Sequence, residues 1–256
     1  GCVGSSKADK LFFADVGYAL QTDRKGNEDF SMDINGTEMN DKKFRTKIKD
    51  LVKNRGFKFS KTFTTDVIYT AVFDNGSGNV NDHFISNKNV DIIEIEAGTE
   101  AKSFTKILEY VNKQNFDNND IIYFVEDDYL HRQGWVDILA EGVQNIGAEY
   151  FTLYDHPDKY YLQMYDNLQS KIICTQSTYW RTTPSTTCTF ACKFSTLQTR
   201  FKTHIQYCSG EYTRDHDMFT ELWNVGSNLI SCMPAYSTHV EANMLSPFIN
   251  WEAECR

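Results

Sequence analysis

Three consecutive carboxylates, Glu126-Asp127-Asp128, directly follow the apolar run at residues 120–125 (DIIYFV). A short apolar run of this kind predicts a buried β-strand. Carboxylates clustered at the end of such a strand repel one another in a partly dehydrated crevice. A divalent cation removes that repulsion, and hard oxygen ligands suit Mg²⁺ or Mn²⁺, which then neutralises a phosphorylated substrate. The triplet therefore favours a metal site; an acidic turn solvated at the surface is the alternative.

The sequence around the triplet alternates predicted strands and helices. We expect strands at residues 11–18, 67–73, 90–96, 120–125 and 149–154, and helices at residues 42–55, 99–114 and 135–146. This order predicts an α/β fold with a mainly parallel central sheet and helices on both faces. Ligands bind beyond the carboxyl ends of the strands in such sheets. That rule points to Asp74, Gly98, the acidic triplet and the pair Asp155-His156.

The overall charge of the chain limits its partners. The 256 residues carry a formal net charge of −9, which argues against a general nucleic-acid binder. Residues 1–60 are the exception, because they hold twelve Lys/Arg against nine Asp/Glu. Eight of those bases fall at residues 42–58, where a solvated helix face is the simplest interpretation. An anionic membrane surface or a lipid-linked phosphate acceptor is the alternative partner.

The cysteines and the N-terminus indicate where the protein acts. The seven cysteines show no zinc-site spacing, which favours reduced thiols and a cytoplasmic location. No run of about eighteen apolar residues predicts a membrane span. The first residues, Gly1-Cys2-Val3-Gly4-Ser5-Ser6, fit a myristoylation pattern with an adjacent palmitoylation site. Acylation would give peripheral membrane association through the N-terminus; a chance match is the alternative.

The run at residues 124–130 (FVEDDYL) resembles the Asp-x-Asp region of GT-A-fold glycosyltransferases, in its Glu-Asp-Asp form. Residues 180–186 (WRTTPST), 214–218 (RDHDM) and 234–239 (PAYSTH) resemble later regions of these enzymes. The resemblance leaves out residues 1–9, a flexible N-terminal segment, and about 20–40. It implies a GT-A-like, Rossmann-type single domain over residues 10–256. Residues 10–165 would bind the nucleotide sugar, and residues 166–256 would form the acceptor side and supply the catalytic base.

The resemblance implies a metal and donor site built on the triplet. Asp128 would bind Mn²⁺ (or Mg²⁺) that bridges the donor diphosphate, with Asp127 near the ribose or donor sugar. Glu126 would support the strand end. His239 would complete the metal shell or contact the diphosphate, and an imidazole suits Mn²⁺ better than Mg²⁺. A structural role is the alternative for His239.

The resemblance also implies a catalytic base. Asp215 takes the position of the base in inverting enzymes, and Asp217 is the reserve. Arg214 departs from the pattern, because a second acid is usual there. The following residues through Leu222 predict an amphipathic helix, so N-capping is the alternative role for Asp215.

Further candidates follow the other strand ends. In the family, an acidic residue such as Asp74 lies against the base or ribose, and Asp15 is a weaker candidate for this task. An Asx turn that opens residues 74–78 (DNGSG) is the alternative role for Asp74. Gly98 would lie beside the bound nucleotide sugar.

Five more residues are candidates for contacts with the acceptor or donor sugar. Asp155 and His156 lie in a polar, aromatic segment at a strand end, where an ordinary surface loop is the alternative. Trp180, Arg181 and Ser185 would line the acceptor cleft, since Trp offers an apolar face and Arg a phosphate fork. Burial in the core is the alternative for Trp180.

These features predict a metal-dependent, inverting glycosyltransferase. It would move a sugar from a UDP- or GDP-linked donor to a glycan, lipid-linked or protein acceptor. A divalent-metal phosphohydrolase or nucleotidyltransferase is one alternative, although the sequence holds no P-loop and no His-x-His pair. A non-catalytic nucleotide- or glycan-binding module is the other.

Overall fold

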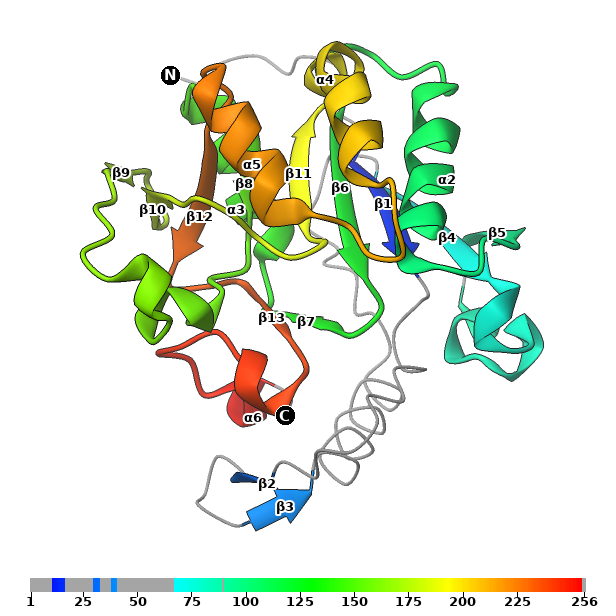
Figure 1. Ribbon diagram of the computed structural model, residues 1–256, viewed down its shortest axis with the longest axis horizontal. Helices are drawn as coiled ribbons and strands as arrows, with labels where there is room; N and C mark the ends of the chain where they lie inside the picture. The colour runs from blue at the N-terminus through cyan, green and yellow to red at the C-terminus, as the bar shows by residue number, and fades with distance from the viewer. Residues whose placement is uncertain (1–10, 17–29, 33–37, 41–66, 89, 255–256) are drawn as a thin grey trace.

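The computed structural model describes residues 11–16, 30–32, 38–40, 67–88 and 90–254 (Figure 1). Within them, nine strands form one sheet. These are β1 (Leu11–Val16), β4 (Val67–Asp74), β5 (Asp91–Ile95), β6 (Ile121–Glu126), β8 (Tyr150–Thr152), β9 (Ile172–Cys174), β10 (Tyr179–Thr182), β11 (Phe190–Lys193) and β12 (Leu229–Met233). Their order is β5-β4-β1-β6-β11-β8-β12-β10-β9.

The sheet is mixed but mainly parallel. Strands β5, β4, β1 and β6 are parallel neighbours, and β8 and β12 form a second parallel pair. Strand β11 runs antiparallel to β6 and β8, and β10 runs antiparallel to β12 and β9. Two of the nine strands therefore oppose the other seven, which confirms the predicted α/β fold. The carboxyl ends of β4, β5, β6 and β8 all lie along one edge.

Helices cover both faces of the sheet, as predicted. Helices α2 (Glu100–Asn112), α4 (Phe194–Tyr207) and α5 (Asp215–Asn224) pack on one face, and α3 (Trp135–Asn145) packs on the other (Figure 1). Strand β6 is buried from both sides. Its Ile122 and Phe124 join the first helical layer, whereas Tyr123 and Val125 face α3. This alternation follows from the two-residue period of a strand and explains the continuous apolar run.

Shorter elements decorate the strand ends. Strand β7 (Tyr129–His131) pairs antiparallel with β13 (Ser237–His239), and β2 (Phe30–Met32) pairs with β3 (Glu38–Asn40). The 3₁₀ turns are η1 (Asn75–Ser77), η2 (Val80–Asp82), η3 (Phe84–Asn87), η4 (Pro157–Tyr160), η5 (Gln163–Tyr165) and η6 (Ala242–Met244). The short helix α6 (Trp251–Glu254) ends the described chain.

The predicted elements in the described part of the first half are confirmed, with shifted ends. Helix α2 begins where expected, because Thr99 Oγ1 accepts a hydrogen bond from the Lys102 N–H at 3.3 Å. The sequence predicted no strand or helix at residues 190–207, where the structure has β11 and α4. The fully buried His204 interrupts the apolar stripe of α4, so the helical pattern is weak in the sequence.

Several expectations concern residues outside the described ranges. They are the N-terminal segment 1–9 with Gly1 and Cys2, and the basic helix at residues 42–55. Among the described residues, no helix is both long enough and apolar enough to cross a bilayer.

Candidate metal and nucleotide site

The acidic triplet lies where β6 ends. Glu126 is the last residue of β6, and the chain then turns at Asp127 and Asp128 before it enters β7. Strand β13 pairs with β7 in a register that places His239 opposite Tyr129. The Val240 N–H donates to the Asp128 carbonyl oxygen at 2.8 Å. This small ladder brings His239 to the triplet across a long stretch of chain.

Glu126, Asp128 and His239 form a group with metal-ligand geometry. One ligand atom from each residue lies within 4.8 Å of the other two. His239 Nε2 is 2.7 Å from Asp128 Oδ2. The second oxygen, Asp128 Oδ1, is buried and has no hydrogen-bond partner among the described residues. A buried carboxylate oxygen without a donor is costly, and a hard cation satisfies it, so these residues fit Mn²⁺ or Mg²⁺.

The surroundings of His239 fix the orientation of its ring. The ring stacks on Tyr129 with 5.2 Å between centroids, and the Tyr129 hydroxyl donates to the Thr187 carbonyl at 2.8 Å. On the far side, His239 Nδ1 lies 3.8 Å from a carboxylate oxygen of Glu241. An imidazole whose second nitrogen faces a carboxylate is typical of metal-binding histidines.

Asp127 points to a different partner. Its Oδ2 lies 3.2 Å from His83 Nε2. His83 precedes η3, and its Nδ1 accepts from the Ile85 N–H. The sequence did not predict a role for His83, because this residue lies between two short 3₁₀ turns and belongs to no regular pattern.

Negative charge converges on Glu126. Burial raises the pKa of its carboxyl well above the usual range, and the carboxylates of Asp128, Glu100, Asp215 and Asp127 raise it further. The triplet is therefore close to two acids from other elements, one from α2 and one from α5. A bound cation would relieve this repulsion.

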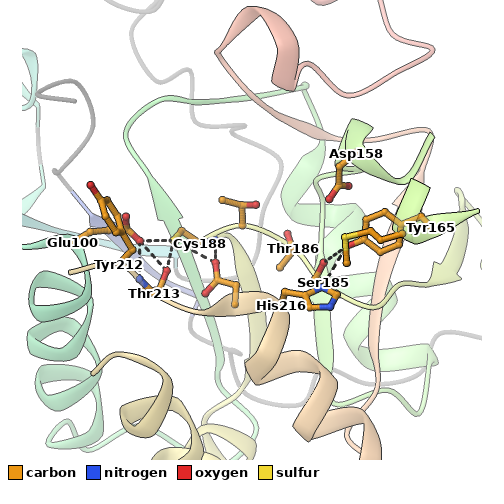
Figure 2. A pocket seen from close by; sticks show the side chains of 12 residues that line it. Glu100, Asp158, Tyr165, Ser185, Thr186, Cys188, Tyr212, Thr213 and His216 are labelled. Atoms are coloured by element: carbon orange, nitrogen blue, oxygen red, sulfur yellow. Dashed lines mark hydrogen bonds between the residues drawn. The ribbon is translucent and has the colours of Figure 1, made fainter. Parts of the chain in front are cut away.

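An open cleft of about 420 Å³ is lined by Glu100 and Asp215, the two acids from other elements whose charges act on Glu126. Figure 2 shows Glu100, Tyr212 and Thr213 at one end, Asp158 and Tyr165 at the other, and Cys188 and Thr186 between them. Asp215 and His216, from the start of α5, line the same cleft. Residues 185–188 line the cleft and also contact the candidate metal site. The Thr187 carbonyl accepts a hydrogen bond from the hydroxyl of Tyr129, whose ring stacks on His239.

Asp215 is a partly buried acid in this cleft. Its Oδ2 accepts a hydrogen bond from the Cys188 N–H at 2.7 Å. Burial raises the pKa of Asp215 to about 6, although the hydrogen bonds from Cys188 act in the opposite direction. Arg214 holds the N-cap position of α5, and no side chain caps it. The carboxylate is thus directed at the cleft wall instead of at its own helix end.

Cys188 adopts a backbone conformation that is unusual for a residue with a side chain. Its φ is 40°, in the left-handed region. Its thiol lies 3.3 Å from Thr213 Oγ1, whose hydroxyl in turn donates to Glu100 Oε1 at 2.8 Å. Strained backbone of this kind collects at functional sites, where the surroundings hold it in place.

The reserve base, Asp217, lies outside the cleft. Its side chain is 57% exposed and sits 3.8 Å from Arg214. Its catalytic role stays a prediction.

Asp74 and Gly98 meet each other at the sheet edge. Asp74 Oδ1 accepts from the Gly76 and Ala97 N–H groups, and Oδ2 accepts from the Gly98 N–H and from Ser103 Oγ at 2.6 Å. Burial acts to raise the pKa of Asp74, but these hydrogen bonds outweigh it and lower the pKa. The turn that we weighed as the alternative is present, and nucleotide binding stays a prediction. Asp15 lies in β1 in register with Val125, and its side chain is outside the described structure.

Four of the five candidates for sugar contacts, namely Asp155, His156, Arg181 and Ser185, have polar side-chain partners. Asp155 is buried and accepts from Arg181 and from the Tyr160 hydroxyl. His156 Nδ1 lies 2.9 Å from Asp158 Oδ1. Ser185 lines the cleft, where its hydroxyl meets Tyr165 at 3.3 Å.

Trp180 requires a correction. Its ring is 0% exposed, packs edge-on against Phe151, and leaves no room for a Cβ at Gly142. It contributes no surface to a cleft, because the whole side chain is buried in the core.

Sequence reasoning missed most of the cleft lining. Glu100 had the pattern of an ordinary first-turn helix acid, and Cys188, Thr213 and Tyr165 lay in stretches without periodicity. His216 lies within residues 214–218 (RDHDM), the motif that indicated Asp215, so its position in the motif could have suggested a place in the cleft. Its Nδ1 lies 3.3 Å from the Tyr165 hydroxyl.

No known family model and no curated protein matches the chain in sequence. Among solved structures, the chain is similar to a nucleotidyl transferase from Methanothermobacter thermautotroptrophicus, with 9% identity, a TM-score of 0.40, and coverage of 89% of this chain and 88% of that one. It is also similar to 4-diphosphocytidyl-2C-methyl-D-erythritol synthase from Anaerococcus prevotii, with 8% identity, a TM-score of 0.42, and coverage of 90% and 89%. At this identity the activity of a neighbour does not transfer to the chain.

Proposed function

We propose that the protein is a divalent-metal-dependent glycosyltransferase that moves a sugar from a nucleoside diphosphate donor to a hydroxyl acceptor, with inversion. The observation that carries the proposal is the buried Asp128 Oδ1, which has no hydrogen-bond partner in the part of the chain that the structure describes and belongs to the group Glu126, Asp128 and His239. The ligand chemistry of two carboxylates and an imidazole suits Mn²⁺, with Mg²⁺ as the alternative. When bound there, the cation would offset the negative charge that develops on the departing diphosphate.

Asp215 is the proposed general base. An inverting transfer requires a proton acceptor on the acceptor side of the anomeric carbon. Asp215 is the candidate, because it lines the cleft and comes from α5, whereas the triplet follows β6. A pKa of about 6 leaves its carboxylate ionised near neutral pH while keeping it basic enough to take a proton. The Cys188 N–H holds one oxygen and so orients the carboxylate.

The composition of the cleft supports sugar transfer over phosphoryl or nucleotidyl transfer. Enzymes that act on triphosphates usually surround the phosphates with Lys or Arg in addition to metal ions. Among the described residues that line this cleft, none is Lys or Arg. Hydroxyl side chains are abundant there instead, including Ser185, Thr186 and Thr213.

A panel of nucleotide sugars tests the proposal. Thermal shifts are measured with each UDP- and GDP-linked sugar, with and without Mn²⁺, and the strongest Mn²⁺-dependent donor is then incubated with hydroxyl acceptors. We expect release of the nucleoside diphosphate and a glycoside of inverted anomeric configuration, read by NMR. Retained configuration would contradict the inverting mechanism. Pyrophosphate release from a nucleoside triphosphate and a sugar phosphate would replace sugar transfer by nucleotidyl transfer.

A further inference from the structure

We infer that the acceptor is a saccharide without anionic groups, and that the cleft rejects phosphorylated or carboxylated acceptors. This inference rests on the proposed function and adds the chemical class of the acceptor. It follows from the acids, hydroxyls and aromatic ring that line the cleft, and from the ion pairs of Lys159 and Arg181 near it.

Three acids line the cleft. Glu100 lies at one end and Asp158 at the other (Figure 2), and Asp215 also lines it. Lys159 offsets the charge of Asp158, so Glu100 and Asp215 carry the negative charge of the cleft. Glu126, Asp127 and Asp128 at the candidate metal site add further negative charge nearby. One divalent cation balances two of these charges, and the donor diphosphate adds two more. An anionic acceptor would therefore enter a site of its own sign, and like charges in close contact oppose binding strongly.

Two cations near the cleft, Lys159 and Arg181, are held in buried ion pairs. Lys159 is almost fully buried, and its Nζ lies 3.2 Å from Asp158 Oδ1. Arg181 pairs with Asp155 and stacks over the Tyr160 ring at 5.1 Å. Neither residue lines the cleft. A phosphate or carboxylate on the acceptor would have to break one of these buried pairs to gain Lys159 or Arg181 as a partner, and breaking such a pair is costly. Arg214, next to Asp215, does not line the cleft and lies 3.8 Å from Asp217.

The remaining lining suits an uncharged sugar. Ser185, Thr186 and Thr213 offer hydroxyls that both donate and accept, as sugar hydroxyls do. Tyr212 lines the cleft and is largely exposed, so its ring offers a face on which the apolar face of a sugar can pack. A site with one apolar surface and several hydroxyls recognises a neutral polyol better than an ion.

A matched set of acceptors tests the inference. The strongest Mn²⁺-dependent donor from the thermal-shift panel is used with neutral oligosaccharides, with the same oligosaccharides oxidised at C6 to carboxylates, and with their 6-amino counterparts. Release of nucleoside diphosphate gives kcat/KM for each acceptor at low and at moderate ionic strength. We expect kcat/KM to be at least about tenfold lower for the oxidised acceptors than for the neutral ones, and the gap to narrow with added salt. The amino counterparts should equal or exceed the neutral ones.

A charge added at the cleft mouth should shift this preference. Met164 lines the cleft and is 63% exposed, so Met164→Arg places a cation there without creating a cavity. We expect the ratio of kcat/KM for oxidised over neutral acceptors to rise about tenfold. Val225→Arg is the matched control, because Val225 is 56% exposed and follows the opposite end of the helix that begins at Asp215. It adds the same charge and should leave the ratio unchanged.

Two results would overturn the inference, and they are distinguishable. Equal or higher kcat/KM for the oxidised acceptors would reject the acceptor class and leave sugar transfer intact. No stimulation of diphosphate release by any hydroxyl compound over the acceptor-free rate would reject the proposed function, and the acceptor class with it.

Discussion

Asp74 ends β4 and Asp128 lies just after β6, at the same edge of the sheet and with β1 between the two strands, yet their carboxylates are in opposite conditions. Asp74 accepts four hydrogen bonds, two on each oxygen, and is 2% exposed. Asp128 shares one oxygen with His239, and its other oxygen is buried without a partner among the described residues. A carboxylate accommodates about four donors, so the capacity of Asp74 is filled and that of Asp128 is not.

From this difference we propose a structural role for Asp74 and a ligand-binding role for Asp128. The four donors of Asp74 tie the end of β4 to the start of α2, which stabilises the fold. The unfilled oxygen of Asp128 is costly unless a group from outside the chain supplies the missing charge. Position at a strand end therefore marks candidate residues, and unused acceptor capacity distinguishes between them.

Asp128→Asn should produce the largest effect. The amide removes the negative charge that would hold the cation and leaves the side-chain volume unchanged. We expect affinity for a nucleoside diphosphate in the presence of Mn²⁺ to fall at least about a thousandfold, in keeping with the worth of a charged metal ligand. Isothermal titration with and without Mn²⁺ measures it.

The circular dichroism spectrum of Asp128→Asn should match that of the wild type, because the backbone hydrogen bond from Val240 to Asp128 stays in place. Unchanged Mn²⁺-dependent binding in this variant would show that the cation lies elsewhere.

Asp215→Asn should have the next largest effect, on turnover and not on donor affinity. The amide keeps the acceptor for the Cys188 N–H and removes the basicity. We expect kcat to fall roughly a hundredfold or more with donor affinity little changed, which is the usual worth of a general base. In the wild type, kcat/KM should fall as the pH drops through about 6, since the protonated Asp215 is not a base. Asp217→Asn is the control, and near-normal turnover in Asp215→Asn together with a loss in Asp217→Asn would move the role to Asp217.

Asp74→Asn should alter stability instead of metal binding. One of its oxygens becomes an amide that cannot accept from Gly98 N–H and Ser103 Oγ, or from the opposite pair. We expect the free energy of unfolding to fall by about 2 kcal/mol, as for lost hydrogen bonds to a charged group. Urea unfolding measures this loss, and Mn²⁺-dependent diphosphate affinity should stay within about twofold. A large loss of donor affinity with full stability would instead support the predicted contact between Asp74 and the nucleotide.

The sequence was informative where local pattern determines structure. The run at β6 and the cap at Thr99 both follow from short-range physics, namely burial from two sides and an unsatisfied helix terminus. The same rules placed the triplet at the carboxyl end of a strand. They did not predict helix α4, because the buried His204 stands at an apolar position of its pattern and forms a 2.9 Å hydrogen bond with the Tyr150 hydroxyl.

The cleft could not be predicted, because long-range contacts form it. Glu100, Cys188 and Thr213 come from three separate segments and meet only through the packing of α2 against α4 and of α4 against α5. Trp180 illustrates the reverse case. Residue type suggested a sugar platform, but only the fold reveals that Gly142 and Phe151 enclose the ring.

The smallest expected effect is a gain in stability for Asp215→Asn that depends on pH. The fold raises the pKa of this carboxyl from 3.8 to about 6, so the folded state holds the proton more tightly than the unfolded chain. As the pH rises from about 4 to about 6, the unfolded chain ionises first, and the wild type loses stability across that window. Asn does not ionise and still accepts from Cys188, so the variant avoids this loss. We expect equal stability near pH 4 and a variant about 1 kcal/mol more stable above pH 6, measured by urea unfolding without metal. Asp217→Asn, at a 57% exposed side chain, should show no such window. A variant less stable than the wild type above pH 6 would mean that the fold stabilises the ionised Asp215. Its role would then be structural, like the role proposed for Asp74.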